Sequence, residues 1–179
     1  MKKKFFIILI AFLAITFLSQ PVQAQEEIAG GSAVLEKPNF EVDERATKLE
    51  KFLENYHSPL AEYADIFIEN ADKYELDWKL VAAITGVEST FGKQIPVGSF
   101  NAYGWANGTY AFKSWEESIE VVSKALKEKY IDRGLDTPVK MGPVYAPPSK
   151  TWAGKVNFFM KQIDCFGELQ CLETLALTI

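Results

Sequence analysis

The stretch from Asp77 to Gly92 constrains the fold more than any other part of this chain. Asp77 is placed to cap the start of a helix, and Gly92 is suited to follow its end. Between them apolar residues recur at helical spacing, namely Leu80, Ile84, Val87 and Phe91. Because the predicted helix is apolar on nearly every face, we expect the rest of the chain to be organised around it.

One acidic residue, Glu88, lies within this predicted helix. At 100° per residue it falls between Ile84 and Val81, inside the apolar arc. Burying a carboxylate without a partner is costly, so such a group either finds donors or keeps its proton through a raised pKa. A proton held near neutral pH is what a general acid needs. The alternative is a structural glutamate that pairs with a lysine or caps a neighbouring backbone.

Four short motifs, beginning at Glu88, follow one another in an order that resembles a known enzyme family. They are Glu88-Ser89-Thr90-Phe91-Gly92, Asn101-Ala102-Tyr103-Gly104-Trp105, Phe112-Lys113-Ser114-Trp115-Glu116-Glu117-Ser118 and Tyr145-Ala146. Together they resemble the glucosaminidase-type murein hydrolases, which are mannosyl-glycoprotein endo-β-N-acetylglucosaminidase-like domains with a lysozyme-like fold. The first motif is also similar to the soluble lytic transglycosylases, which share that fold. The resemblance extends over residues 60–163.

This resemblance implies specific roles for the residues of the motifs. Glu88 is expected to protonate the glycosidic oxygen between amino sugars of peptidoglycan or a related glycan. Tyr145 corresponds to a tyrosine opposite the catalytic glutamate, where its hydroxyl would position the N-acetyl group or stabilise charge. The alternative is that Tyr145 anchors a proline-rich loop. The residues expected to contact the glycan are Ser89, Asn101, Tyr103, Gly104 and Trp105.

The dipeptide Asn107-Gly108, flanked by alternating aromatic residues, predicts a small β-hairpin over residues 103–112. Its rings would either form a platform for the flat CH faces of sugars or close a small core over the helices. For Tyr103 and Trp105 we favour the platform, on the basis of the resemblance. Asn101 either contacts the glycan or fixes the loop that enters the hairpin.

Retaining and inverting glycosidases usually need a second carboxylate. The resembled family often supplies one from the hairpin region, but residues 99–113 contain no aspartate or glutamate. Three explanations are open. The N-acetyl group of the substrate could act as nucleophile, or a single acid could suffice, as in lytic transglycosylases, which leave an anhydro sugar. Alternatively Glu116 or Glu117 could reach the cleft, although a capping box opened by Ser114 accounts for Glu117 and the first helical turn for Glu116.

The N-terminus predicts export. Residues 1–24 combine three lysines, an apolar run over residues 5–18 and small residues at Val22 and Ala24. This pattern is typical of a signal peptide cleaved after Ala24, and it predicts a secreted or cell-envelope protein without a membrane anchor. An uncleaved anchor is the alternative, although the run is short for a membrane span. Residues 25–41 predict a flexible leader.

Charge and histidine content argue against several classes of function. The chain has a formal charge of −5, which becomes −8 once the three lysines of the signal peptide are removed. With no basic patch, neither nucleic acid nor an anionic membrane surface is an expected partner. His57 is the only histidine, which speaks against a catalytic zinc site and a Ser-His-Asp triad. We therefore expect a carboxylate enzyme with no metal and no cofactor.

The two cysteines, Cys165 and Cys171, lie close to the C-terminus. In an exported chain they predict one disulfide within a C-terminal tail of residues 165–179. A cysteine nucleophile is the alternative, but it needs an activating base, and His57 is over 100 residues upstream.

Helical periodicity predicts four further helices along the chain. The first is a short amphipathic helix over residues 42–57, and the second begins at Ser58-Pro59 and runs to residue 74. A third begins after Ser114, and a last one follows Ser149. Residues 131–148 are rich in glycine and proline, so they predict an irregular loop.

The predicted fold is mainly α, or α+β in detail: a lysozyme-like helical domain over residues 58–164 with one small β-hairpin. We expect a monomer that cleaves β-1,4 bonds next to N-acetylglucosamine or N-acetylmuramic acid in peptidoglycan, as a hydrolase or as a lytic transglycosylase. Two other classes stay open. A non-catalytic cell-wall binding module is favoured by the hairpin's lack of an acid and opposed by Glu88; a partner-binding helical domain would need an exposed apolar patch.

Overall fold

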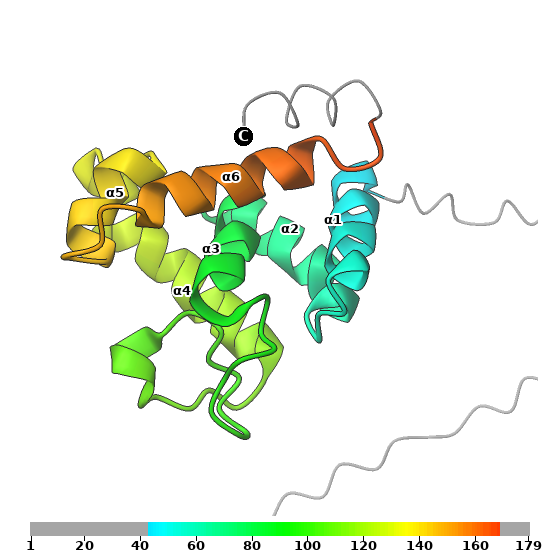
Figure 1. The fold of residues 1–179 in the computed structure, drawn as a ribbon, viewed down its shortest axis with the longest axis horizontal. Coiled ribbons are helices and arrows are strands. Elements are labelled where there is room, and N and C mark those ends of the chain that lie inside the picture. The colour runs from blue at the N-terminus through cyan, green and yellow to red at the C-terminus, as the bar shows by residue number, and fades with distance from the viewer. Residues whose placement is uncertain (1–42, 169–179) are drawn as a thin grey trace, which may run out of the picture. The chain divides into compact units, whose positions relative to one another are not determined.

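A computed structural model describes residues 43–168, which are helical throughout except for their connecting segments (Figure 1). The α-helices are α1 (Glu44–Asn55), α2 (Ala64–Lys73), α3 (Leu80–Ser89), α4 (Trp115–Lys129), α5 (Pro138–Tyr145) and α6 (Trp152–Asp164). Three short 3₁₀ helices are η1 (Ala61–Tyr63), η2 (Trp105–Gly108) and η3 (Ile131–Arg133). No β-strand occurs within residues 43–168. The mainly α class is confirmed, and the predicted hairpin is wrong.

Several predictions fall on parts of the chain that lie outside the described residues. These are the signal peptide (residues 1–24), the leader (residues 25–41) and Cys171. Cys165 follows directly after α6 and is buried. Its pairing with Cys171 therefore stays a prediction. Among residues 43–168, no helix is both long enough and apolar enough to cross a membrane.

Helix α3 lies at the centre of the fold, as its sequence predicts. Every residue from Leu80 to Gly86 is buried. The helix packs against α6, α2 and α4, and Figure 1 shows α6 running past one side of it and α4 past another. An all-round apolar surface can be buried only by such enclosure. Helix α3 therefore holds the residues of its last turn in a fixed position.

The end of α3 differs from the prediction. The helix stops at Ser89, and Thr90, Phe91 and Gly92 all have positive φ angles of 53°, 57° and 77°. The chain turns back sharply there, so that the Phe91 ring lies buried beneath the helix. An added Cβ at Gly86 would come within 2.6 Å of that ring. Gly86 therefore permits this close packing.

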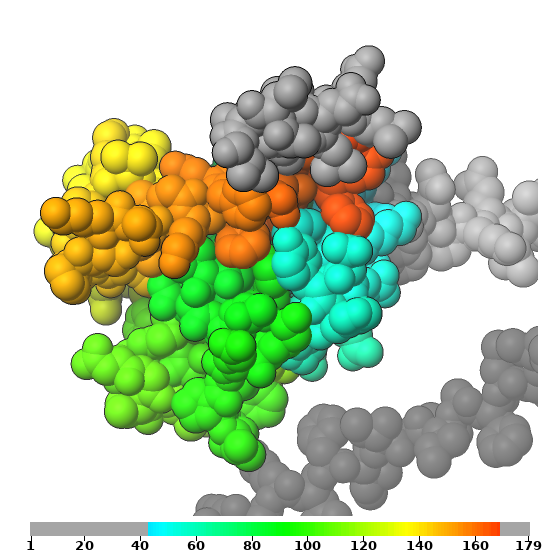
Figure 2. Space-filling model, viewed as in Figure 1, coloured from blue at the N-terminus to red at the C-terminus, as the bar shows by residue number. Residues whose placement is uncertain are grey.

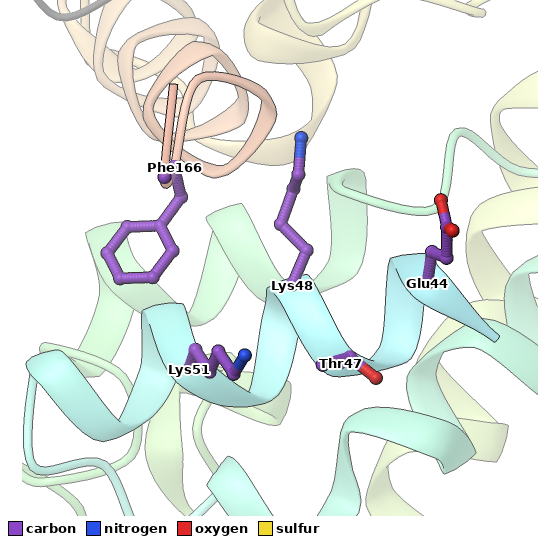
Figure 3. A pocket seen from close by; sticks show the side chains of 6 residues that line it. Glu44, Thr47, Lys48, Lys51 and Phe166 are labelled. Atoms are coloured by element: carbon purple, nitrogen blue, oxygen red, sulfur yellow. The ribbon is translucent and has the colours of Figure 1, made fainter. Parts of the chain in front are cut away.

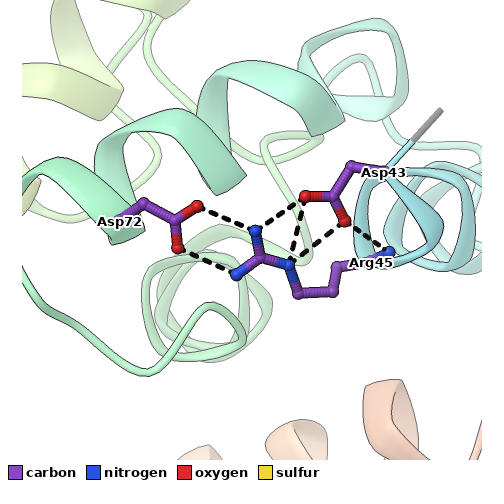
Figure 4. A network of polar contacts seen from close by, with 3 residues as sticks. All are labelled: Asp43, Arg45 and Asp72. Atoms are coloured by element: carbon purple, nitrogen blue, oxygen red, sulfur yellow. Dashed lines mark hydrogen bonds and ion pairs between the residues drawn. The ribbon is translucent and has the colours of Figure 1, made fainter. Parts of the chain in front are cut away.

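Helix α1 belongs to the same core as the remainder of residues 43–168. Its buried face consists of Leu49, Phe52 and Leu53, and the Phe52 ring meets Phe91 edge-on with centroids 5.5 Å apart. The predicted domain boundary at residue 58 therefore cuts through this core. The helix start is also tied to the end of α2, because Arg45 donates to both carboxylate oxygens of Asp72 at 2.8 Å (Figure 4).

Arg45 also binds Asp43, the N-cap residue of α1, so one guanidinium joins two carboxylates (Figure 4). Hydrogen bonds from Arg45 lower the pKa of both Asp43 and Asp72. All three side chains are exposed, so each pair contributes only about 0.2–1 kcal/mol. The network joins the start of α1 to the end of α2 and adds little to the stability of the fold.

Helix α2 begins later than predicted. Ser58 does not open an α-helix; its hydroxyl accepts from the Leu60 N–H at 3.0 Å and donates to the Phe91 carbonyl at 2.8 Å. A 3₁₀ turn, η1, follows, and α2 proper starts at Ala64. The serine thus links this turn to the end of α3.

The prediction of an irregular loop over residues 131–148 is wrong, because this segment contains η3 and α5. Thr137 caps α5 by accepting from the Lys140 N–H at 3.4 Å, and Pro138 occupies its first position, where proline is well tolerated. Gly142 and Pro143, which suggested a break, lie inside the helix. The predicted cap at Ser114 is observed. The N-cap of α6 is Thr151 and not Ser149, although the Ser149 hydroxyl accepts from the Trp152 N–H at 3.1 Å.

Candidate functional site

Glu88 lies in the last turn of α3 and is exposed, in contrast to the predicted burial. Ile84 and Val81, one and two turns earlier, are buried. In the final turn Val87 is half-buried and Glu88 is exposed, whereas Ser89 stays buried, so the apolar arc ends before Glu88. The sequence pattern gives the direction of a side chain around the helix axis but not the depth of the core along it.

The Glu88 carboxylate is held by Trp152, the first residue of α6. The indole Nε1–H donates to Oε1 at 2.7 Å, and Trp152 itself is 3% exposed. The other oxygen, Oε2, faces Gly104, where an added Cβ would lie 3.5 Å away. Although Glu88 as a whole residue is exposed, partial burial of its carboxyl raises its pKa, and the hydrogen bond from Trp152 opposes this rise. The site thus holds a protonatable carboxyl in a fixed orientation.

Tyr145 completes this group from the end of α5. Its ring stacks on Trp152 with centroids 4.7 Å apart and planes 25° apart, and its hydroxyl donates to the Tyr103 carbonyl at 3.2 Å. Burial raises the pKa of Tyr145 well above its ordinary value, and the nearby charge of Glu88 adds to this rise. The structure therefore brings Glu88, Tyr145 and Gly104 together, as the motif order implies.

Ser89 lies beneath the site and is 3% exposed. Its hydroxyl is within hydrogen-bonding distance of the Ala102 carbonyl at 2.9 Å and of the Thr85 carbonyl at 3.1 Å. It also accepts from the Gly92 N–H at 2.9 Å. These contacts tie the end of α3 to the loop opposite, so the structure places Ser89 as a support and not as a surface for glycan.

Asn101 fixes the loop that replaces the predicted hairpin. Its side-chain amide donates to the carbonyls of Trp105 and Tyr110, at 3.0 and 2.9 Å. Its Oδ1 accepts from the N–H of Trp105 at 2.9 Å and lies 3.4 Å from that of Tyr103. Of the two roles predicted for Asn101, the structure favours the loop-fixing one, because these bonds engage both ends of the amide.

The two aromatic residues predicted as a platform differ in how far they are buried. Tyr103 is 2% exposed and belongs to the core, with its hydroxyl near Ser118, and its burial raises the pKa. Trp105 is half-buried, and the Lys129 ammonium lies 5.5 Å from its ring centroid. Of this pair only Trp105 has a ring placed to meet a ligand.

A cavity of about 310 Å³ adjoins this group of residues. It lies between the 103–107 loop, the second half of α4 and Tyr145. Figure 2 shows the surface indented between the segment coloured yellow to orange, which contains α5 and the start of α6, and the green segment that follows α3. Gly104 and Tyr145 border both this cavity and Glu88.

Neither proposed second carboxylate is placed to reach Glu88. Glu117 accepts from the Lys113 N–H at 2.5 Å while its own N–H donates to Ser114, which is the predicted capping role. Glu116 lines a groove against α2 instead. The explanation that relies on these two residues loses its support.

Trp152 and Lys129 are site residues that the sequence reasoning missed. Trp152 was predicted only as part of the last helix. A buried indole needs a partner for its N–H, but the sequence does not indicate that this partner is Glu88, 64 residues away. Lys129 gave no signal, because a lysine in the last turn of a helix is ordinary.

A separate pocket of about 490 Å³ lies on the outer face of α1 (Figure 3). It is lined by Lys48, Lys51 and Phe166 among others. Lys48 donates to the Asp164 carbonyl at 2.9 Å and pairs with Glu168, which ties α1 to the end of α6. None of the predicted site residues lines this pocket.

Within residues 43–168, no group of three or more His, Cys, Asp or Glu side chains is arranged to hold a metal ion. A comparison with models of known protein families finds no match for the chain, and a search of curated proteins finds none either.

Proposed function

We propose that the protein is an exported glycosidase that cleaves β-1,4 bonds between the amino sugars of peptidoglycan, with Glu88 as the general acid. One observation carries this proposal: a carboxyl with a raised pKa is held by a buried indole and faces Gly104, which lines a cavity that Glu88 itself does not line. The motifs that resemble murein hydrolases supply the class of substrate.

The hydrogen bond to Trp152 assigns different tasks to the two oxygens of Glu88. Oε1 accepts from the indole, so the proton of the neutral acid resides on Oε2, on the side of Gly104. Because Gly104 has no side chain, a glycosidic oxygen has room to approach there. As the C–O bond breaks, Oε2 delivers its proton to the leaving oxygen, and the Trp152 N–H stabilises the carboxylate that forms.

The positive charge that develops at the sugar C1 needs a nucleophile or an anion. With Glu116 and Glu117 engaged elsewhere, the substrate is left to supply it. The carbonyl oxygen of the 2-acetamido group can attack C1 and form an oxazoline ring. Water then attacks C1 with Glu88 as base, which opens the oxazoline and restores the acetamido group. Alternatively the sugar's own 6-hydroxyl attacks C1 and returns a proton to Glu88, which leaves an anhydro end.

Tyr145 is suited to hold the acetamido group in either route. Its hydroxyl proton is donated to the Tyr103 carbonyl, so a lone pair of its oxygen remains to accept from the acetamido N–H. Because its pKa is raised, Tyr145 stays neutral across the physiological range. We propose that it orients the substrate and takes no part in proton transfer.

Release of dye-labelled fragments from cell-wall material tests the proposal. The mature chain (residues 25–179) is expected to release dye, and Glu88→Gln to lose at least about a hundredfold in rate, since general acid catalysis contributes roughly 10²–10⁴-fold. Glu116→Gln, which removes an exposed acid facing α2, is the matched control and should keep its activity. Equal rates for Glu88→Gln and wild type would refute the role of Glu88.

A non-catalytic cell-wall binding module is the second candidate, and the engagement of Glu116 and Glu117 away from Glu88 favours it. It predicts that wild type and Glu88→Gln both sediment with wall material while neither releases dye. The same assay therefore separates the two candidates.

A further inference from the structure

The cavity beside Glu88 has an unusual balance of charge. Among the described residues that line it, Lys129 is the only charged one. The rest of the lining is aromatic or aliphatic apart from Asn107 and backbone groups. The chain has 24 acidic and 19 basic residues and is negative overall, whereas the charge on the lining of this cavity is positive.

Lys129 also differs from the neighbouring lysines of α4. Lys127 pairs with Glu75 and Asp132, and Lys124 pairs with Glu128 at 3.8 Å. No acidic side chain between residues 43 and 168 pairs with Lys129; its ammonium lies over the Trp105 ring. Three ammonium protons are thus available at the mouth of a cavity whose wall includes an aromatic ring.

We propose that Lys129 and Trp105 form a subsite for a carboxylate-bearing amino sugar. The Trp105 ring contacts the apolar face of the sugar, and the Lys129 ammonium donates to the carboxylate. In peptidoglycan that carboxylate belongs either to the lactyl group of N-acetylmuramic acid, where no peptide is attached, or to the peptide stem. This subsite rests on the proposed function for its substrate class.

The subsite would set the register of the glycan. Gly104 and Tyr145 lie next to both the cavity and Glu88. A glycan chain with one sugar held at Lys129 would therefore present a nearby glycosidic bond of the same chain to Glu88. Recognition of a carboxylate on alternate sugars would select one of the two kinds of β-1,4 bond. Lys129 would then be a specificity-determining residue of the enzyme.

Calorimetric titration of the mature Glu88→Gln chain, which is expected not to consume its ligands, tests this proposal. The ligands are a peptide-free oligomer of alternating N-acetylglucosamine and N-acetylmuramic acid, the same oligomer carrying stem peptides, and a neutral N-acetylglucosamine oligomer. Adding Lys129→Gln should weaken binding of at least one carboxylated ligand about 3- to 10-fold at low salt, and leave the neutral oligomer unchanged. Lys124→Gln is the matched control and should change none of the three.

The pattern of losses decides the outcome. A loss with the peptide-free oligomer assigns the lactyl carboxylate, and a loss with the peptide-bearing oligomer alone assigns the stem. Equal losses for all three ligands, no loss for any, or no binding by the Glu88→Gln chain itself would overturn the subsite. If wild type releases nothing from cell walls but the charge-selective loss is found, the subsite stands and the enzymatic proposal alone fails.

Discussion

At the scale of single residues, the candidate site depends on one hydrogen bond. The Trp152 indole binds Oε1 of Glu88 at 2.7 Å, and this contact both orients the carboxyl and moderates its pKa. Neither partner could be joined to the other from sequence, since they are 64 residues apart. Glu88 was predicted as the acid from its position inside an apolar arc of the helix, whereas the residue is exposed in the structure.

Replacing Trp152 by phenylalanine should alter the pH dependence of cleavage. The indole N–H stabilises the charged carboxylate, so its loss raises the pKa of Glu88 further. Because the protonated form is the active one, rate falls as pH rises through this pKa. The alkaline limb of the kcat profile should therefore move to higher pH in Trp152→Phe, while kcat at its optimum drops roughly 10-fold through lost orientation.

The control for this variant is Trp78→Phe, which changes a half-buried tryptophan that contacts Lys79. It should leave the pH profile in place. An unchanged or acid-shifted alkaline limb in Trp152→Phe would argue against Glu88 as the titrating acid.

At the scale of elements, the helices with clear caps and periodicity were predictable. Helix α4 begins at its capping serine, Ser114, as expected, and α6 begins shortly after Ser149, with Thr151 as its N-cap. The absence of the hairpin was not predictable from such local patterns. Asn107 and Gly108 do adopt the positive φ angles that a hairpin turn requires, at 57° and 78°. The flanking segments do not pair as strands, because the amide of Asn101 holds the loop carbonyls from inside. The sequence offers Asn101 as a loop-fixing residue, but its contacts, four and nine residues along the chain, are no part of the pattern that indicates a hairpin.

The sharp turn after α3 makes a specific demand on Gly86. A Cβ there would meet two atoms of the buried Phe91 ring at 2.6 and 2.7 Å. Gly86→Ala should therefore lower the free energy of unfolding by about 1–3 kcal/mol, as overpacked cores do, despite the higher helix propensity of alanine. Urea denaturation monitored by circular dichroism measures it.

Gly154, in the first turn of α6, is the matched control. A Cβ there would meet nothing within 4 Å, so Gly154→Ala should instead raise the free energy of unfolding by up to about 1 kcal/mol. Stabilisation by both substitutions would contradict the packing described for Phe91.

At the scale of the whole molecule, one core joins α1 to the helices that carry the site. The sequence suggested α1 as a helix, but its amphipathic pattern could not show whether it packs on the domain. Phe52 and Tyr56 contact Phe91, whose turn supports the end of α3. The site at Glu88 thus depends on residues that the predicted boundary at residue 58 excluded.

A chain that begins at residue 58 is therefore expected not to fold cooperatively. It lacks Leu49, Phe52 and Leu53, each at most 1% exposed, and loss of one such side chain already costs roughly 2–5 kcal/mol. Against a total stability of about 5–15 kcal/mol, losing all three is decisive. Thermal unfolding followed by near-ultraviolet circular dichroism should show a transition for a chain starting at residue 43 and none for the shorter chain. A sharp transition in both would restore the boundary at residue 58.

Mass spectrometry of the fragments released from purified peptidoglycan shows whether the protein cleaves the glycan with Glu88 as its acid. The mature chain should produce fragments that end either in a reducing amino sugar or in an anhydro sugar, according to whether the acetamido group or the 6-hydroxyl attacks C1, and Glu88→Gln should produce neither. Intact peptidoglycan after digestion with wild type, or the same fragments from Glu88→Gln, would contradict the account.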